Sequence, residues 1–134
     1  ELNPNYSDTF VFDNDFAALQ PDTPKYCDAD PLFGLSSEQG VSRVICFSPD
    51  HSATLATLSE EQIFKVVSVW QEQTLQLGQK YRWVQLFENK GEIMGCSNPH
   101  PHGQVWAQQQ LPTLAVKKQA AFASAHTHGL VRLK

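Results

Sequence analysis

The clearest hydrophobic pattern in the chain predicts an amphipathic helix over residues 59–78. Ser59 and Gln62 form a capping-box pattern at its start, and Gly78 suits the position that follows the last helical turn. Apolar side chains recur at the spacing of one helix face, namely Ile63, Val66, Val67, Trp70, Thr74 and Leu77. Polar side chains outside this stripe are Lys65, Glu72, Gln73 and Gln76.

Four shorter segments predict strands, at residues 9–16, 41–47, 83–88 and 102–108. The second is β-branched and apolar on both faces, which indicates a central strand. Residues 20–40 are rich in Pro, Asp, Ser and Gly and predict a long surface loop. The order strand, strand, helix, strand, strand predicts an α+β fold with the helix packed on one face of the sheet.

Composition narrows the class of protein. A chain of 134 residues is long enough for one domain. Its net charge of -4 argues against a general nucleic-acid surface, and it has no apolar run long enough for a membrane span. The first residues do not have the charged-then-apolar pattern that is typical of a secretory signal. Three scattered cysteines without a Cys-x-x-Cys pair fit a reducing compartment, so we expect a cytoplasmic protein.

Residues 94–106 concentrate the groups that can do chemistry. Pro99 and Pro101 favour extended backbone, so His100, His102 and Gln104 should point to one face. Gly103 should leave room for a ligand to approach the backbone. Gly95 and Ser97 add a small-residue loop whose free N–H groups suit phosphate oxygens.

Two histidines on one face allow several interpretations. They can belong to a fortuitous turn, or they can form a two-histidine metal site. Imidazole can also act as a nucleophile toward phosphorus, because it is largely neutral at pH 7 and leaves readily when protonated. The residue types alone leave these three alternatives open.

The string from Gly95 to Gln104 resembles the signature of the galactose-1-phosphate uridylyltransferases, a family within the histidine-triad superfamily. Similarity extends through residues 11–19, 42–52, 70–74 and 83–91 and covers about residues 3–112. The resemblance implies a histidine-triad-like antiparallel sheet and places the chain within the N-terminal half of the family's fold. We therefore expect a partial uridylyltransferase domain over residues 1–112 and a divergent tail over residues 113–134.

The activity implied by this resemblance is uridylyl transfer in galactose metabolism. His102 would attack the α-phosphorus of UDP-glucose, and galactose 1-phosphate would then take the uridylyl group from the histidine. Gln104 would hold a phosphate or bridging oxygen. The first 110 residues carry all 14 acids and 6 of the bases, so these phosphates would need a metal, a helix dipole or residues outside the chain.

The same match assigns binding residues. Asn14 and Asp15 would hold the uridine and ribose, although from the residues alone they equally suit a turn at a strand end. The loop that wraps the diphosphate would comprise Asn89, Gly95, Cys96 and Ser97. Cys96 by itself is more typical of a small packing residue.

The resemblance also implies metal binding. His51 and His100 match zinc ligands, and the family completes this tetrahedral site with a Cys-x-x-Cys pair that is absent here. By itself His51 would be an exposed loop histidine. A second metal, for which iron is the candidate, loses its glutamate ligand, because Lys118 stands at that position. His126 and His128 are interpreted as a solvated tail.

Two other functions remain open at this point. One is another branch of the superfamily, such as a dinucleoside-tetraphosphate phosphorylase that moves AMP. The other is a fragment that binds without catalysing. Complete members of the family form homodimers, and we expect these 134 residues alone to be an inactive part of such an enzyme.

Overall fold

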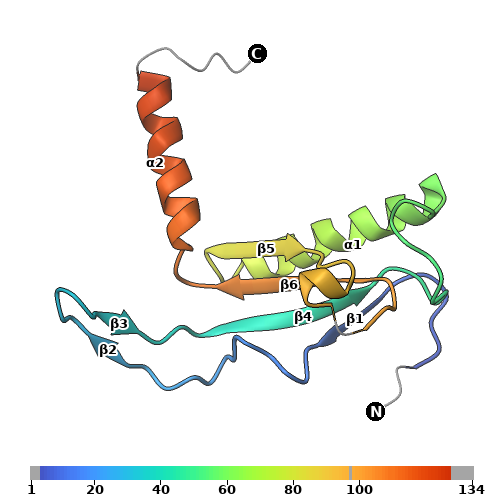
Figure 1. The fold of residues 1–134 in the computed structure, drawn as a ribbon, viewed down its shortest axis with the longest axis horizontal. Coiled ribbons are helices and arrows are strands. Elements are labelled where there is room, and N and C mark those ends of the chain that lie inside the picture. The colour runs from blue at the N-terminus through green and yellow to red at the C-terminus, as the bar shows by residue number, and fades with distance from the viewer. Residues whose placement is uncertain (1–3, 97, 128–134) are drawn as a thin grey trace.

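The computed structural model describes residues 4–96 and 98–127. A four-stranded antiparallel sheet in the order β1-β4-β6-β5 is covered on one face by the helix α1 (Figure 1). The bounds are β1 Phe10–Asp13, β4 Gly40–Cys46, α1 Glu60–Gly78, β5 Trp83–Phe87 and β6 His102–Gln108. The predicted α+β architecture is confirmed, with β4 central as its apolar pattern indicated.

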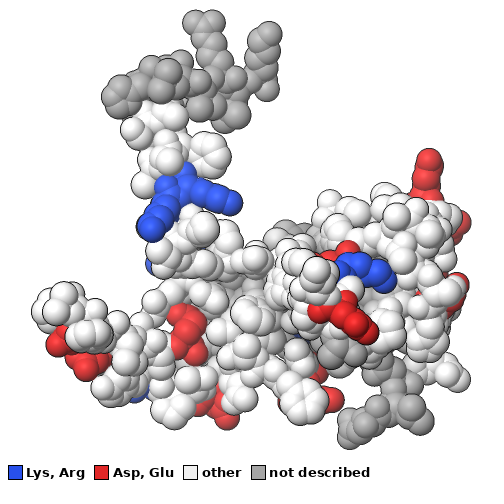
Figure 2. Space-filling model, in the orientation of Figure 1, with Lys and Arg blue, Asp and Glu red and all other residues white. Residues whose placement is uncertain are grey.

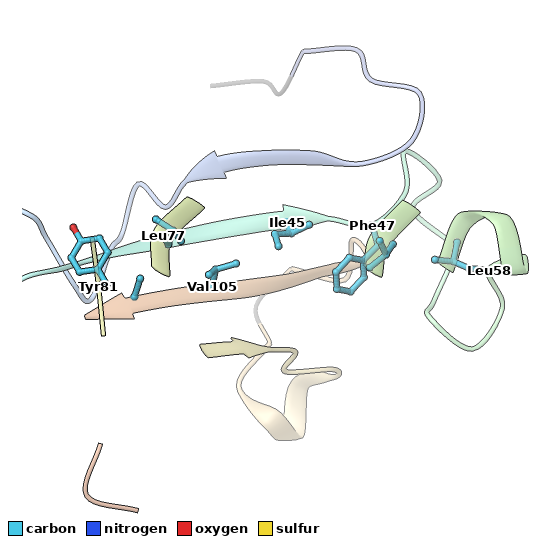
Figure 3. Close-up of a cluster of buried hydrophobic side chains, with 8 residues drawn as sticks. Ile45, Phe47, Leu58, Leu77, Tyr81 and Val105 are labelled. Carbon is cyan, nitrogen blue, oxygen red and sulfur yellow. The ribbon is translucent and has the colours of Figure 1, made fainter. Parts of the chain in front are cut away.

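The hydrophobic core lies between α1 and the sheet. Ile45 of β4 and Val105 of β6 are fully buried and belong to one cluster with Val66 and Leu77 of α1. Figure 3 shows Ile45 and Val105 on neighbouring strands beside Leu77. Each such side chain contributes roughly 1.5–3 kcal/mol when it is fully buried. This face of the sheet is therefore closed by the helix, and a binding site has to use the opposite face.

The start of α1 follows the predicted capping box. The Ser59 hydroxyl accepts from the Gln62 N–H at 3.3 Å, and the Gln62 side chain accepts from the Ser59 N–H at 2.9 Å. The prediction for Gly78 was wrong, because Gly78 is the last helical residue. Gln79 caps the helix with right-handed backbone, at φ -68° and ψ -28°. The chain continues to wind after Gly78, since the Lys80 N–H donates to the carbonyl of Leu77 at 3.1 Å.

Gln73 was wrongly placed outside the apolar stripe of α1. It is 5% exposed, and its side-chain oxygen accepts from Arg43 Nη1 at 2.6 Å. Arg43 projects from β4 toward α1 and also donates to Gln76 and Asp13. A partly buried guanidinium still needs polar partners, so these contacts draw Gln73 into the interface.

Two further parts of the chain contain regular structure beyond the prediction. The long loop over residues 20–40 includes an exposed hairpin of β2 (Cys27–Asp28) and β3 (Leu35–Ser36). The predicted tail includes a second helix, α2 (Thr113–Thr127), which packs against no other helix or strand in the described ranges. Figure 1 shows α2 projecting away from the sheet, and Figure 2 shows basic atoms but no acidic ones on it. No helix among the described residues is long and apolar enough to cross a membrane.

Candidate functional site

The sheet face opposite α1 carries the predicted catalytic residues. Along β6 the buried residues face α1, whereas the alternate residues His102 and Gln104 face the other side. There they line a cleft of about 740 Å³ together with His100, as the extended motif predicted. The predicted site residues on this cleft are Asn14, Asp15, His51, His100, His102 and Gln104. No lysine or arginine of the described ranges lines it, in keeping with the acidic balance of the first 110 residues.

A smaller cavity of about 170 Å³ adjoins the same motif. It is lined by Asn89 and Cys96, two of the residues predicted to wrap a diphosphate, and also by His100 and His102. Lys90 is the basic residue of this lining, which also contains two glutamates. His102 therefore lines both cavities, at the point where a ligand extending from one to the other would pass.

A hydrogen bond to the backbone determines the orientation of His102. Its Nδ1 lies 2.7 Å from the carbonyl oxygen of His100, and a carbonyl can only accept. Nδ1 therefore carries the proton in this contact. In the neutral ring the lone pair then lies on Nε2, which is the form required of an imidazole nucleophile.

His51 and His100 lie together at the rim of the cleft. Their Nδ1 atoms are 2.8 Å apart, and the ring centroids are separated by 4.6 Å. Burial lowers the pKa of His100 below its usual value, and the neighbouring His51 and His102 lower it further, against a small opposing effect of the Ser48 backbone. A lowered pKa favours the neutral ring, which is the form that binds metal ions.

Tyr6 completes this cluster and was missed in the sequence analysis. Its hydroxyl oxygen lies 2.7 Å from Nε2 of His100, and the hydroxyl donates to the carbonyl of Ser48 at 3.0 Å. Burial and the nearby Cys46 thiol raise the pKa of Tyr6 to about 12. A single tyrosine far from the motif carries no periodic or spacing signal, so the sequence pattern offered no means of finding it.

Asn98 was also missed. Its side-chain oxygen accepts from the His100 N–H at 3.0 Å, and its backbone carbonyl accepts from the Cys96 thiol at 3.0 Å. Asparagine before proline commonly forms this kind of side-chain-to-backbone turn. The Asn-Pro pair at residues 98–99 was therefore a usable signal for a residue that shapes the loop.

Asn14 forms the turn at a strand end that its residue type allowed, and it also lies at the larger cleft. Its side-chain oxygen accepts from the Phe16 N–H at 3.0 Å, which makes a turn at the end of β1, and its own N–H donates to Ser42. Asn14 nevertheless lines the larger cleft, as does the exposed Asp15 beside it. The turn thus places both residues at the cleft.

The predicted phosphate loop differs from expectation. Gly95 follows the short 3-10 helix η1 (Glu92–Met94), and its N–H donates to the Glu92 carbonyl at 2.9 Å. The Cys96 N–H donates to the Gly91 carbonyl at 3.2 Å. Both N–H groups close a turn, so the Gly95 N–H is not the free donor that was predicted. Ser97, assigned to the same loop, lies outside the described residues.

The prediction that Gly103 admits a ligand was wrong. Gly103 is buried on the α1 side of the sheet, where a Cβ would lie 2.7 Å from Cζ of Phe47. Phe47 is 2% exposed and packs edge-on against Trp70 of α1. Glycine is required here because an aromatic ring from the core occupies the space of a side chain.

Within the described ranges, no group of three or more His, Cys, Asp or Glu residues could hold a metal ion. His51 and His100 form a pair, which is consistent with the two ligands expected from this chain. Lys118 lies on α2. His126 is within α2, but its side chain is not described, and His128 lies outside the described residues.

Comparison with known proteins places this site in a family. The family described as "Galactose-1-phosphate uridyl transferase, N-terminal domain" matches residues 1–112. The galactose-1-phosphate uridylyltransferase of Haemophilus influenzae is 61% identical over 113 residues, which are 84% of this chain and 32% of that protein. The rat enzyme is 49% identical over 131 residues, covering 96% of this chain and 35% of its own length.

A solved structure titled "Structure of uridylyltransferase" has the same fold. It superposes with a TM-score of 0.73 at 25% identity, over 91% of this chain and 40% of that one. The chain spans about a third of the length of the curated relatives described above. The family match includes the strand that carries His102 and Gln104 and the loops that bring His51 and His100 together. The chain therefore belongs to the galactose-1-phosphate uridylyltransferase family, in the region of its N-terminal domain.

Proposed function

We propose that this chain supplies the nucleotide-transfer machinery of a galactose-1-phosphate uridylyltransferase. The uridylyl group would pass from UDP-glucose to His102 and then to galactose 1-phosphate. The observation that carries the proposal is the contact of Nδ1 of His102 with the His100 carbonyl, because it leaves Nε2 as the lone-pair nitrogen at the junction of two cavities. Since the chain spans about a third of its curated relatives, the complete reaction would also draw on residues beyond these.

The transfer would take place in two displacements at phosphorus. In the first, Nε2 of His102 forms a bond to the α-phosphorus while the bond to the bridging oxygen breaks, and glucose 1-phosphate leaves. In the second, a phosphate oxygen of galactose 1-phosphate attacks the same phosphorus and the bond to nitrogen breaks. His102 is restored, so the histidine divides one exchange into two in-line steps that depend on positioning.

The two cavities would hold different parts of the nucleotide substrate. Asn14 and Asp15 line the larger cleft and supply polar groups suited to a ribose and a base. Asn89 and Lys90 line the smaller cavity, where a donor amide and a cation suit phosphate oxygens. A nucleoside diphosphate lying across both would bring its α-phosphorus to His102.

Gln104 would be placed to contact the uridylyl group while it is bound to His102. It follows His102 by two residues on β6 and faces the same cleft. Its amide can donate to or accept from a phosphate oxygen but does not titrate, so it cannot activate water as a general base. This chemistry favours an intermediate that waits for a sugar phosphate over one that is hydrolysed.

We also propose that His51 and His100 supply two ligands of a zinc ion. Their facing Nδ1 atoms fit the donor chemistry of zinc, which takes neutral imidazole nitrogens in tetrahedral sites. By binding His51 and His100, the ion would link the loop after β4 to the loop before β6, next to the proposed nucleophile His102. Its other ligands would come from outside the described residues.

A chimera tests the transfer proposal in a complete enzyme. Residues 1–112 of this chain would replace the corresponding region of the Haemophilus influenzae enzyme, whose 61% identity favours compatible packing. We expect UDP-galactose to form from UDP-glucose and galactose 1-phosphate, and we expect His102→Asn to abolish it. Gln108→Ala, on the same strand but outside both cavity linings, is the matched control and should retain activity.

The nucleotide specificity can be tested with the same chimera. A folded chimera that cleaves diadenosine tetraphosphate but not UDP-glucose would contradict the proposal and favour AMP transfer. A folded chimera that binds UDP-glucose without forming a covalent adduct would indicate a binding function. Circular dichroism and the melting temperature establish folding in each case.

A further inference from the structure

Both ring nitrogens of His100 are engaged. Nδ1 lies 2.8 Å from Nδ1 of His51, and Nε2 lies 2.7 Å from the hydroxyl oxygen of Tyr6. A neutral imidazole carries one proton, so only one of these nitrogens can present a lone pair. The position of that proton decides whether Nδ1 of His100 can bind a cation beside His51.

The hydrogen bond from Tyr6 to Ser48 fixes the position of the proton. The Tyr6 hydroxyl has one hydrogen, which it donates to the Ser48 carbonyl at 3.0 Å. The hydroxyl oxygen can then only accept from His100, so Nε2 must be the donor. In the reverse arrangement Tyr6 would donate to Nε2, and the carbonyl of the buried Ser48 would lose this donor, at a cost of about 1–3 kcal/mol.

We propose that Tyr6 is a positioning residue for a divalent cation, holding His100 with its proton on Nε2 and its lone pair on Nδ1, the atom that faces His51. The proposal rests on the two-histidine metal site proposed above and does not depend on uridylyl transfer. Partners that hold the second nitrogen of a metal-binding histidine fix its tautomer and ring orientation, and their loss typically weakens metal binding about 10- to 100-fold.

The proton balance at His51 is consistent with this role. Without a cation, His51 donates its Nδ1 proton to Nδ1 of His100. Cation binding requires that proton to move to Nε2 of His51 by exchange with water, so that both Nδ1 atoms present lone pairs. His51 is exposed, and solvent can therefore carry out the exchange.

Tyr6 is held in place independently of its hydroxyl. Its ring stacks on Phe10 of β1 with centroids 5.5 Å apart and an interplanar angle of 22°. Two residues later, Asp8 pairs with Lys65 of α1 at 2.7 Å. Tyr6→Phe should therefore remove the hydrogen bonds and leave the stacking.

The first test measures the tautomer directly. Long-range proton–nitrogen NMR spectra of the ¹⁵N-histidine-labelled, chelator-treated 134-residue chain would be recorded near pH 7.5. His100 should carry its proton on Nε2 in the wild type and become a mixture of tautomers in Tyr6→Phe. Tyr26→Phe, at an exposed tyrosine of the β2–β3 region, should match the wild type. A wild-type His100 protonated on Nδ1 overturns the proposal whether or not the Phe variant folds.

The second test is a zinc titration of the same samples, followed at the Nδ1 resonances of His51 and His100. The Kd should rise about 10- to 100-fold in Tyr6→Phe and stay within about twofold in Tyr26→Phe. An equal Kd in all three proteins overturns the role of Tyr6. Zinc that leaves both Nδ1 resonances of the wild type unmoved overturns the metal site itself. Neither experiment measures uridylyl transfer. A failure of the transfer proposal can therefore be told apart from a failure of the role proposed for Tyr6.

Discussion

The carbonyl oxygen of His100 accepts a hydrogen bond from Nδ1 of His102 at 2.7 Å. This contact separates the roles of two histidines in one short motif. The backbone of His100 orients the ring of His102 toward the cavities, while the side chain of His100 faces His51 at the rim of the larger cleft. A change to His100 should therefore affect metal binding through its side chain and leave the hydrogen bond to His102 in place.

Removing the nucleophile should abolish transfer. In the chimera we expect His102→Asn to lower the rate by more than about 10⁴-fold, because no other imidazole on β6 faces the cavities. The same change should prevent labelling of the protein by UDP-glucose that carries a radioactive uridylyl phosphate. Persistent labelling would exclude His102 as the attacking group. His102→Gly should recover the second step when imidazole uridylate is supplied, since that compound carries the missing group already formed.

Loss of either metal-site histidine should affect stability more than nucleotide binding. In the zinc-loaded chimera, His51→Asn and His100→Asn should each lower the melting temperature, because the ion is bound only by the folded state. The Kd for UMP should change by less than about threefold, since zinc would act through loop structure. A chelator should lower the melting temperature of the parent chimera and leave both variants almost unchanged. Equal responses of all three proteins to the chelator would argue against this site.

The metal-free chain should lose stability as the pH falls below about 6.5. The folded state lowers the pKa of His100, so the unfolded chain binds a proton first as the pH decreases. The stability that follows from neutral His100 is present above the unfolded value of 6.5 and is lost as the pH falls through the folded value. His100→Asn should remove this component, which urea unfolding at a series of pH values would measure.

At alkaline pH the stability of the chain should change in the opposite direction, decreasing as the pH rises. Burial raises the pKa of Cys46 above 9.0, and that of Tyr6 is raised from 10.0 to about 12. Stability from these neutral groups should be present below about pH 9 and should decrease as the pH rises further. The pKa values of Asp8, Asp30 and Asp50 are lowered from 3.8, so the stability that these carboxylates contribute is lost only as the pH falls below about 3.8. They therefore do not change the stability in either of the two pH ranges considered. Unfolding data that show no change above pH 9 would contradict the burial of these two groups.

Gly103→Ala should destabilise the fold by about 1–3 kcal/mol, the usual cost of overpacking a core. The added Cβ would meet Cζ of Phe47 at 2.7 Å. Phe47→Leu should relieve part of this cost in the double variant, so the two changes should couple favourably in a double-mutant cycle. Additive effects in urea unfolding would show that the Phe47 ring does not occupy this space.

The sequence predicted those parts of the fold that depend on local patterns. The capping box at Ser59 and the alternation along β6 are properties of adjacent residues, and both are confirmed. Gln73 could not be placed in the same way, because its burial depends on Arg43, which reaches it from another strand. Gly103 was wrongly predicted to leave room for a ligand for a similar reason. The Phe47 ring that fills this space comes from a residue far from Gly103 in the sequence.

The candidate site shows the same limit. His51, His100, His102 and Gln104 were found through residue type, spacing and resemblance, and they line one cleft. Tyr6 comes from a segment 94 residues before His100 and has no motif of its own. Its relevance depends on a three-dimensional contact, which the pattern of a single sequence does not contain.

The 134-residue chain alone should show no measurable transferase turnover, although it contains the nucleophile. Two described residues form the metal pair where a tetrahedral zinc site needs four ligands, and no described lysine or arginine lines the larger cleft. Transfer depends on positioning, and a displacement of about 1 Å can cost roughly 100-fold in rate. β1 and β5 are also edge strands of the described sheet, which favours association of isolated chains. The measurement is UDP-galactose formation by the purified, folded chain with excess zinc, beside the chimera. Turnover within about tenfold of the chimera would show that these residues suffice, and would contradict the requirement for further ligands and cations.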